Sequence, residues 1–167
     1  MICGTDPVRY WVFENWCDPV DMADVPGRGD PAWEVGYDND CEKGKRTTRC
    51  LDCIPGVADL FARMQSPGEW PQPLGYEVET DSTLHGGGIH VTEPGGWLST
   101  HLDYALHPKL PGKKRAINFI AFLNPIWLPD WGGALTLCDP LGNVVVRFQP
   151  QPGRLVAFEV GDLSYHG

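Results

Sequence analysis

The amino-acid sequence predicts a mainly β domain of the sandwich or barrel type, with a helical and irregular segment at its N-terminal side. From about residue 84 onward, short apolar runs recur with turn residues between them, which is the pattern of many short strands. The 20 glycines and 16 prolines also favour turns and short elements over long helices. The length of 167 residues fits a single domain, 1–167, that is large enough to bury a core.

We expect the first two zones of this domain to support the third. Residues 1–54 are rich in Asp, Gly, Pro and Trp, and they predict irregular structure with one strand or short helix around 10–16. Residues 55–83 are expected to be helical support. Four apolar residues recur there at i, i+3, i+4 and i+7, the spacing of one helix face: Val57, Leu60, Phe61 and Met64. The run Ser66-Pro67-Gly68 predicts the end of that helix.

The third zone, 84–167, predicts the β core. An apolar stretch begins at Ile89, and Glu93-Pro94-Gly95-Gly96 predicts a turn after it. The remaining strands are expected at 97–104, 116–123, 134–138, 144–148 and 155–160.

The charge balance limits the partners of the chain. A formal net charge of −9 argues against non-specific nucleic-acid binding and against an anionic membrane surface. One basic run stands out, Lys109, Lys113, Lys114 and Arg115. It is typical of a solvated loop, and the alternative is a positive rim that attracts an anionic co-substrate. Because no apolar stretch approaches about 18 residues and no signal pattern opens the sequence, we expect no membrane association and a cytoplasmic location.

The sequence contains six cysteines: Cys3, Cys17, Cys41, Cys50, Cys53 and Cys138. Because nothing in the sequence indicates secretion, we expect reduced thiols without a structural role. Cys50 and Cys53 have the spacing of half a zinc site, but no second pair with similar spacing completes it. The role of this pair stays open.

His101-Leu102-Asp103 is the first candidate for metal chemistry. On a strand, residues i and i+2 point to the same face, so a His and an Asp two apart can reach one ion. His166 follows a predicted strand and can supply a second nitrogen from a segment distant in sequence. Two histidines and one carboxylate on one face form the facial triad of non-haem iron(II) oxygenases.

The surroundings of these residues strengthen the hypothesis, since five blocks occur in order at compatible spacing. The blocks are 84–90 (LHGGGIH), 95–110 (GG-x-L-x-x-H-x-DY and HPKL), 115–124 (RAIN and FLN), 127–137 (W and WGGAL-x-L) and 164–167 (SYHG). Together they resemble the iron-binding region of 2-oxoglutarate oxygenases related to prolyl 4-hydroxylase. The resemblance covers residues 84–167 and extends more faintly back to Pro55.

This resemblance implies a double-stranded β-helix, or jelly roll, in which His101, Asp103 and His166 hold Fe(II). It implies a dioxygenase that consumes O2 and 2-oxoglutarate, releases succinate and CO2, and uses ascorbate as a reductant. Because related halogenases lack the carboxylate, Asp103 favours hydroxylation. The substrate is expected to be a prolyl residue or a small molecule, and the sequence does not indicate the oligomeric state.

Two features depart from the family pattern. The family carries an Arg about ten residues after its second His, and this residue binds the distal carboxylate of 2-oxoglutarate. The sequence ends at Gly167, so we expect a fragment that lacks the last strand. Phe122 stands where relatives often have a Tyr that touches the same carboxylate, and Phe122 cannot donate that hydrogen bond.

Other polar residues near the motifs have less definite roles. The resemblance places His90 beside the co-substrate, although a hydrogen-bonded strand histidine is an equal alternative. Arg115 is expected to be structural, and Asn118 either faces the pocket or caps the strand end. The alternatives for the whole chain are a non-catalytic, cupin-like metal-binding barrel and a degenerate oxygenase domain. A zinc hydrolase is disfavoured, because no general base stands beside the ligands in the sequence.

Overall fold

The structure is a computed structural model that describes residues 1–66, 78–81 and 83–167. Its chain divides into two compact units. The first unit comprises Met1–Pro19 and Trp97–Gly167, and the second comprises Val20–Gly96. These boundaries differ from the three zones expected from the sequence, because the first residues of the chain group with its last 71 (167 − 96). The single-domain hypothesis stays a prediction.

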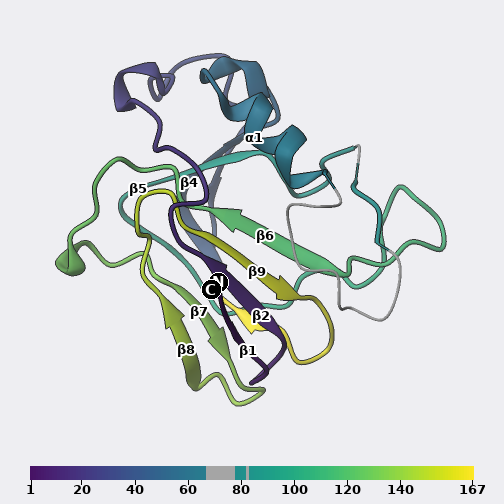
Figure 1. Cartoon of the computed structure of the whole chain (residues 1–167). Helices are drawn as coiled ribbons and strands as arrows, with labels where there is room; N and C mark the ends of the chain where they lie inside the picture. Colours follow the sequence, from purple (N-terminus) through teal and green to yellow (C-terminus); the bar gives the residue numbers. More distant parts are fainter. Residues whose placement is uncertain (67–77, 82) are drawn as a thin grey trace. The chain divides into compact units, whose positions relative to one another are not determined.

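The first unit contains two antiparallel sheets (Figure 1). One has the order β1-β2-β9-β6, formed by β1 (Ile2–Gly4), β2 (Tyr10–Phe13), β9 (Leu155–Glu159) and β6 (Ile117–Ala121). The other has the order β10-β7-β8, formed by β10 (Tyr165–His166), β7 (Leu135–Cys138) and β8 (Val144–Phe148).

Side chains from both sheets share one hydrophobic core. The buried members are Val12, Leu135, Leu137, Phe148, Val156 and Phe158. The ring centroids of Tyr10 on β2 and Phe148 on β8 lie 5.1 Å apart in an edge-to-face contact. The two sheets therefore pack face to face as a β-sandwich, which fits the expected jelly roll. The specific double-stranded β-helix without its last strand stays a prediction.

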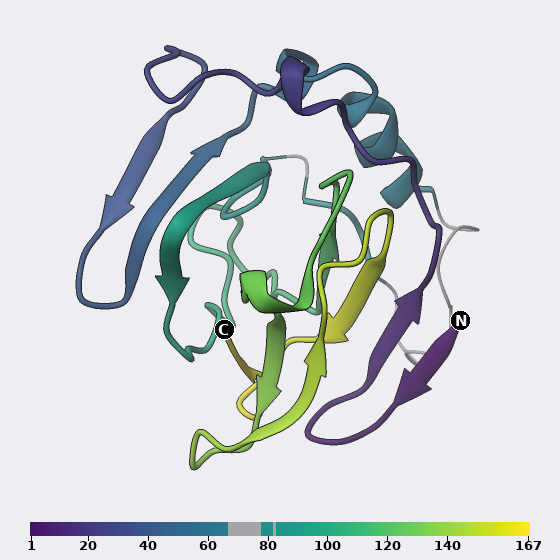
Figure 2. The ribbon, with the colours of Figure 1, turned by 90° about the vertical axis from the view of Figure 1, so that its left-hand side faces the viewer.

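The second unit contains a sheet of order β3-β4-β5 and one α-helix among its described residues (Figure 2). The strands are β3 (Val35–Asp38), β4 (Glu42–Thr48) and β5 (Ile89–Leu98), of which the last two residues count with the first unit. Short 3-10 helices occur at η1 (Met22–Asp24) and η2 (Leu51–Cys53), and in the first unit at η3 (Pro129–Trp131).

The predicted amphipathic helix is confirmed as α1 (Val57–Met64). Val57 is buried, and Leu60, Phe61 and Met64 are half-buried, whereas the intervening Asp59 is exposed. The helix is shorter than the expected support zone, since 78–81 and 83 are not helical, and Pro67 and Gly68 lie outside the described residues. None of the helices in the described part of the chain has the length and apolar character needed to cross a bilayer.

The prediction of an irregular N-terminal zone is wrong, because β1 to β4 all lie within residues 1–54. Only β2 falls in the expected interval around 10–16. β1 and β4 are largely exposed or half-buried, so they lack the alternation that identifies a strand from its sequence. β2 is paired by β9 from the other end of the chain, which a local pattern cannot indicate.

The turn predicted at Glu93–Gly96 is also wrong, because these residues lie inside β5. Gly95 has a φ of 79°, and a Cβ on Gly96 would come within 2.8 Å of the Lys43 carbonyl oxygen on β4. The glycines thus permit a distorted strand and a close backbone approach rather than a turn. β5 ends at Leu98, so the strand expected over 97–104 is largely absent.

Candidate metal site

His101 and His166 face each other across a short backbone pairing. His101 forms an isolated antiparallel bridge with His166, which belongs to β10. The N–H of His101 lies 2.8 Å from the His166 carbonyl oxygen, and the reciprocal distance is 3.0 Å. Directly opposed residues in an antiparallel pair place their side chains on the same side. The two imidazole centroids are accordingly 4.3 Å apart.

Main-chain carbonyls orient both imidazoles. Nδ1 of His101 lies 2.9 Å from the Ser99 carbonyl oxygen, and Nδ1 of His166 lies 2.8 Å from that of Ser164. A carbonyl oxygen can only accept, so Nδ1 carries a proton in each ring, and in the neutral form of the ring Nε2 is the nitrogen with a lone pair. Ser164 is itself fixed, because its buried hydroxyl donates to the Gly161 carbonyl oxygen at 2.8 Å. Each histidine therefore presents Nε2 as its ligand atom.

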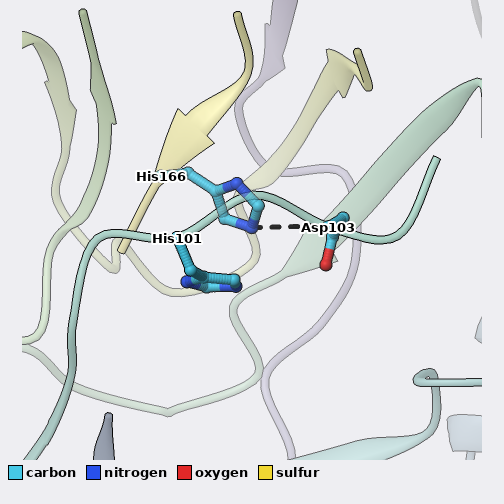
Figure 3. A group of neighbouring side chains, drawn as sticks. All are labelled: His101, Asp103 and His166. Carbon is cyan, nitrogen blue, oxygen red and sulfur yellow. Dashed lines mark ion pairs between the residues drawn. The ribbon is translucent and has the colours of Figure 1, made fainter. Parts of the chain in front are cut away.

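Asp103 completes the cluster (Figure 3). Its Oδ2 lies 3.7 Å from Nε2 of His166. One ligand atom from each of His101, Asp103 and His166 lies within 4.8 Å of the other two. Within the described residues, this is the group of three or more metal-ligating side chains that could share one ion. His166 is buried and the other two are half-buried, so the cluster has an accessible side.

Two further side chains hold the Asp103 carboxylate. Nη1 of Arg115 lies 2.9 Å from Oδ1, and Nδ2 of Asn118 donates to Oδ2 at 2.8 Å. Both oxygens therefore have a partner besides any metal. The sequence left Arg115 without a role at the site and Asn118 with two alternatives. Their contacts depend on how β6 and the preceding loop meet Asp103, for which the sequence carries no local signal.

The surroundings of His166 favour its neutral form. Burial is the main cause that lowers the pKa of His166, and electrostatic interaction with His101 and with Arg115 lowers it further. The Ser164 carbonyl and the Asp103 carboxylate act in the opposite direction and do not reverse the shift. Neutral imidazole is the form that binds a metal ion.

These three residues fit a divalent transition metal. Two neutral imidazole nitrogens and one carboxylate oxygen suit iron, and the three ligand atoms lie within 4.8 Å of one another. The premise that His101 and Asp103 share a regular strand is wrong, because residues 102–104 form none. The expected convergence is nevertheless present, because the bridge to His166 fixes His101 and side-chain contacts fix Asp103.

The comparisons with known proteins agree with this donor set. Residues 87–167 match the family model of the 2OG-Fe(II) oxygenase superfamily, and the matched segment contains all three candidate ligands. The match supports this superfamily for that part of the chain. Neither a curated protein nor a solved structure matches the chain.

The two residues expected beside the co-substrate lie in different units. Phe122 belongs to the first unit, where it packs against the hydrophobic core. His90 lies on β5 in the second unit. Although His90 is exposed by its solvent-accessible surface, desolvation by the surrounding protein and the nearby Lys45 lower its pKa to about 4, against the opposing charge of Glu42. Their roles toward 2-oxoglutarate stay predictions.

The expectation of reduced thiols is wrong for one pair, because Cys50 and Cys53 form a disulfide. The sulfurs bond to each other across η2, so the zinc-like spacing serves a crosslink in this structure. The remaining thiols, Cys3, Cys17, Cys41 and Cys138, are free. Disulfides persist mainly in oxidising compartments, so the cytoplasmic location stays a prediction.

Proposed function

We propose that the chain is an Fe(II)- and 2-oxoglutarate-dependent dioxygenase that hydroxylates its substrate. The convergence of two free Nε2 atoms and one carboxylate, within a segment that matches the oxygenase superfamily, is the observation that carries the proposal. A prolyl 4-hydroxylase-like specificity for a prolyl residue or a small molecule, with ascorbate as reductant, is the finer form of the proposal. We expect no nucleic-acid or membrane partner.

The residues of the chain have distinct tasks in this function. His101, Asp103 and His166 would hold the ion, and three protein ligands leave coordination positions for the co-substrate and O2. The bound iron would supply the activation of dioxygen that is coupled to decarboxylation of 2-oxoglutarate. The carbonyl groups of Ser99 and Ser164 keep both rings in the ligating tautomer.

The direct test is succinate formation from 2-oxoglutarate under air, with Fe(II) and ascorbate present. We expect slow succinate release by the unmodified protein even without its substrate, and faster release when a prolyl peptide or another true substrate is added. His101→Ala should abolish both rates. His85→Ala is the matched control, because it removes a histidine that takes no part in the candidate site, and it should leave both rates unchanged.

The alternatives give different results in the same experiment. Fe(II) binding that depends on His101, without binding of 2-oxoglutarate, would favour a degenerate oxygenase domain or a cupin-like metal-binding barrel. Succinate formation that persists in His101→Ala would contradict the proposed site.

A further inference from the structure

We propose that Arg115 and Asn118 are positioning residues that make Asp103 offer a single oxygen, Oδ2, to the metal ion. The inference rests on the proposed function, because it requires a metal at His101, Asp103 and His166. Arg115 and Asn118 are not ligands themselves, but they would determine whether Asp103 binds the ion through one oxygen or through two.

Asp103 needs such support because its own segment provides little. The chain leaves regular pairing after the bridge at His101, and residues 102–104 belong to no strand. The flanking residues Leu102 and Tyr104 are 39% and 74% exposed, so packing anchors the segment only weakly on either side of Asp103. The orientation of the carboxylate therefore depends on the partners of the carboxylate itself.

Arg115 is held at the base of a hairpin formed by residues 105–115. The N–H of Arg115 donates to the Ala105 carbonyl oxygen at 3.0 Å, and Leu106 pairs with Lys114 one step further along. This hairpin returns Arg115 to the level of Asp103, where the two side chains form the 2.9 Å ion pair. Both side chains are largely shielded from solvent, so the pair is weakened less by water than a surface ion pair.

Asn118 reaches the same carboxylate from the sheet. On β6 it stands directly opposite Phe158 of β9, so both side chains lie on the same face. The Phe158 ring centroid lies 4.9 Å from that of His166, and the Asn118 amide donates to Asp103. The pairing of β6 with β9 thus places Phe158 against the His166 ring and Asn118 against the Asp103 carboxylate.

These contacts divide the two oxygens of Asp103 between different tasks. Oδ1 is engaged by the Arg115 guanidinium, which competes with a metal for that oxygen. Oδ2 accepts one hydrogen bond from Asn118 and keeps a second lone pair on the side of His166. Single-oxygen binding leaves more of the coordination sphere for the co-substrate and O2. Without Arg115, the carboxylate could turn and chelate the ion with both oxygens.

Cobalt(II) binding without co-substrate tests the inference, because the visible spectrum of the bound ion reports its coordination number. The variants are Arg115→Met, which keeps the aliphatic stem, and Asn118→Leu, which removes the donor at similar size. In Arg115→Met we expect the visible spectrum of bound cobalt to shift toward that of a higher coordination number, and in Asn118→Leu we expect the cobalt affinity to fall on the order of 10- to 100-fold. Arg115→Lys restores a positive charge at Oδ1 and should return the spectrum toward that of the unmodified protein.

Arg154→Met is the matched control. Arg154 also pairs with a carboxylate in the first unit, Glu14 at 2.7 Å, but that carboxylate is not a candidate ligand. The control should bind cobalt with the affinity and spectrum of the unmodified protein. If Arg115→Met fails to fold, Asn118→Leu decides the question.

The outcomes separate this inference from the proposed function. Cobalt binding that depends on His101 but is unchanged in affinity and spectrum by Arg115→Met and Asn118→Leu would overturn the inference alone. Absence of cobalt binding by the unmodified protein would overturn both.

Discussion

The surroundings of the His166 imidazole set both the orientation of the ring and its protonation state. The Ser164 carbonyl fixes the ring through Nδ1, and the fully buried Phe158 covers one side of it. Burial among such groups lowers the pKa of His166, so the site is prepared for a metal ion rather than for a proton. Proton binding and metal binding therefore compete at this residue, and metal affinity should weaken in acid.

Phe158→Ala tests the double role of this phenylalanine in the core and beside the ligand. We expect the free energy of unfolding to fall by about 3–5 kcal/mol, because the substitution leaves a cavity in the core. Urea denaturation of the metal-free protein measures the change. Leu141→Ala, at a residue that is 87% exposed, is the control and should change stability by less than about 0.5 kcal/mol. Equal effects of the two substitutions would contradict the assigned core.

The lowered pKa of His90 predicts that the free energy of unfolding decreases in acid. Its pKa is lowered from 6.5 to about 4 in the folded chain, so the unfolded chain binds more protons between these values. The free energy of unfolding should therefore decrease as the pH falls from 6.5 to 4. In His90→Gln this contribution disappears, so its loss of stability over the same range should be smaller. Denaturation midpoints measured at several pH values check this, and parallel curves for both proteins would contradict it.

Some residues of the site can be predicted from the sequence, and others cannot. His101, Asp103 and His166 were predicted because their side chains carry recognisable chemistry at a recognisable spacing. Facing the pocket is one of two alternatives that the sequence offers for Asn118. The contacts of Arg115 and Asn118 with Asp103 are not predicted, because they arise from a hairpin closure and a strand register. For Phe122 and His90, the predicted roles toward 2-oxoglutarate come from the resemblance alone.

At the scale of the elements, the sequence predicts well the strands that are rich in apolar residues. β6 to β9 lie within the predicted intervals, and α1 has the predicted face. The missed strands β1, β3 and β4 are short or rich in Gly and charged residues, so their pairing comes from partners rather than from local preference. From the sequence, the glycines of β5 predict a turn, because a distorted strand and a turn require the same backbone freedom.

Gly96→Ala tests the close approach of β4 and β5. A Cβ at this position would lie 2.7 Å from Thr92 Cγ2 and 2.8 Å from the Lys43 carbonyl oxygen, so the strands must shift. We expect a loss of about 1–3 kcal/mol in the free energy of unfolding. Gly27→Ala is the control, because a Cβ there meets nothing within 4 Å. Equal stability of both variants would show that β5 does not pass β4 as described.

At the scale of the whole molecule, all three candidate ligands belong to the first unit. A ligand that binds only the folded state stabilises it, by about 2.7 kcal/mol when its free concentration is about 100 times its Kd. Metal binding should therefore slow hydrogen exchange in β10, which contains His166, and in β7, which pairs with it, and leave β3 and β4 of the second unit unchanged. Mass-spectrometric exchange with and without cobalt(II) measures this. Protection confined to the second unit would contradict the site.

The central claim is that His101, Asp103 and His166 together hold one Fe(II) ion. Anaerobic equilibrium dialysis with Fe(II) tests it most directly, on the unmodified protein and on alanine variants of each ligand. Asp130→Ala serves as the control, because it removes an exposed carboxylate outside the cluster. The account predicts one ion per chain in the unmodified and control proteins, and loss of binding in all three ligand variants. Retention of one tightly bound ion in any of the ligand variants would contradict it.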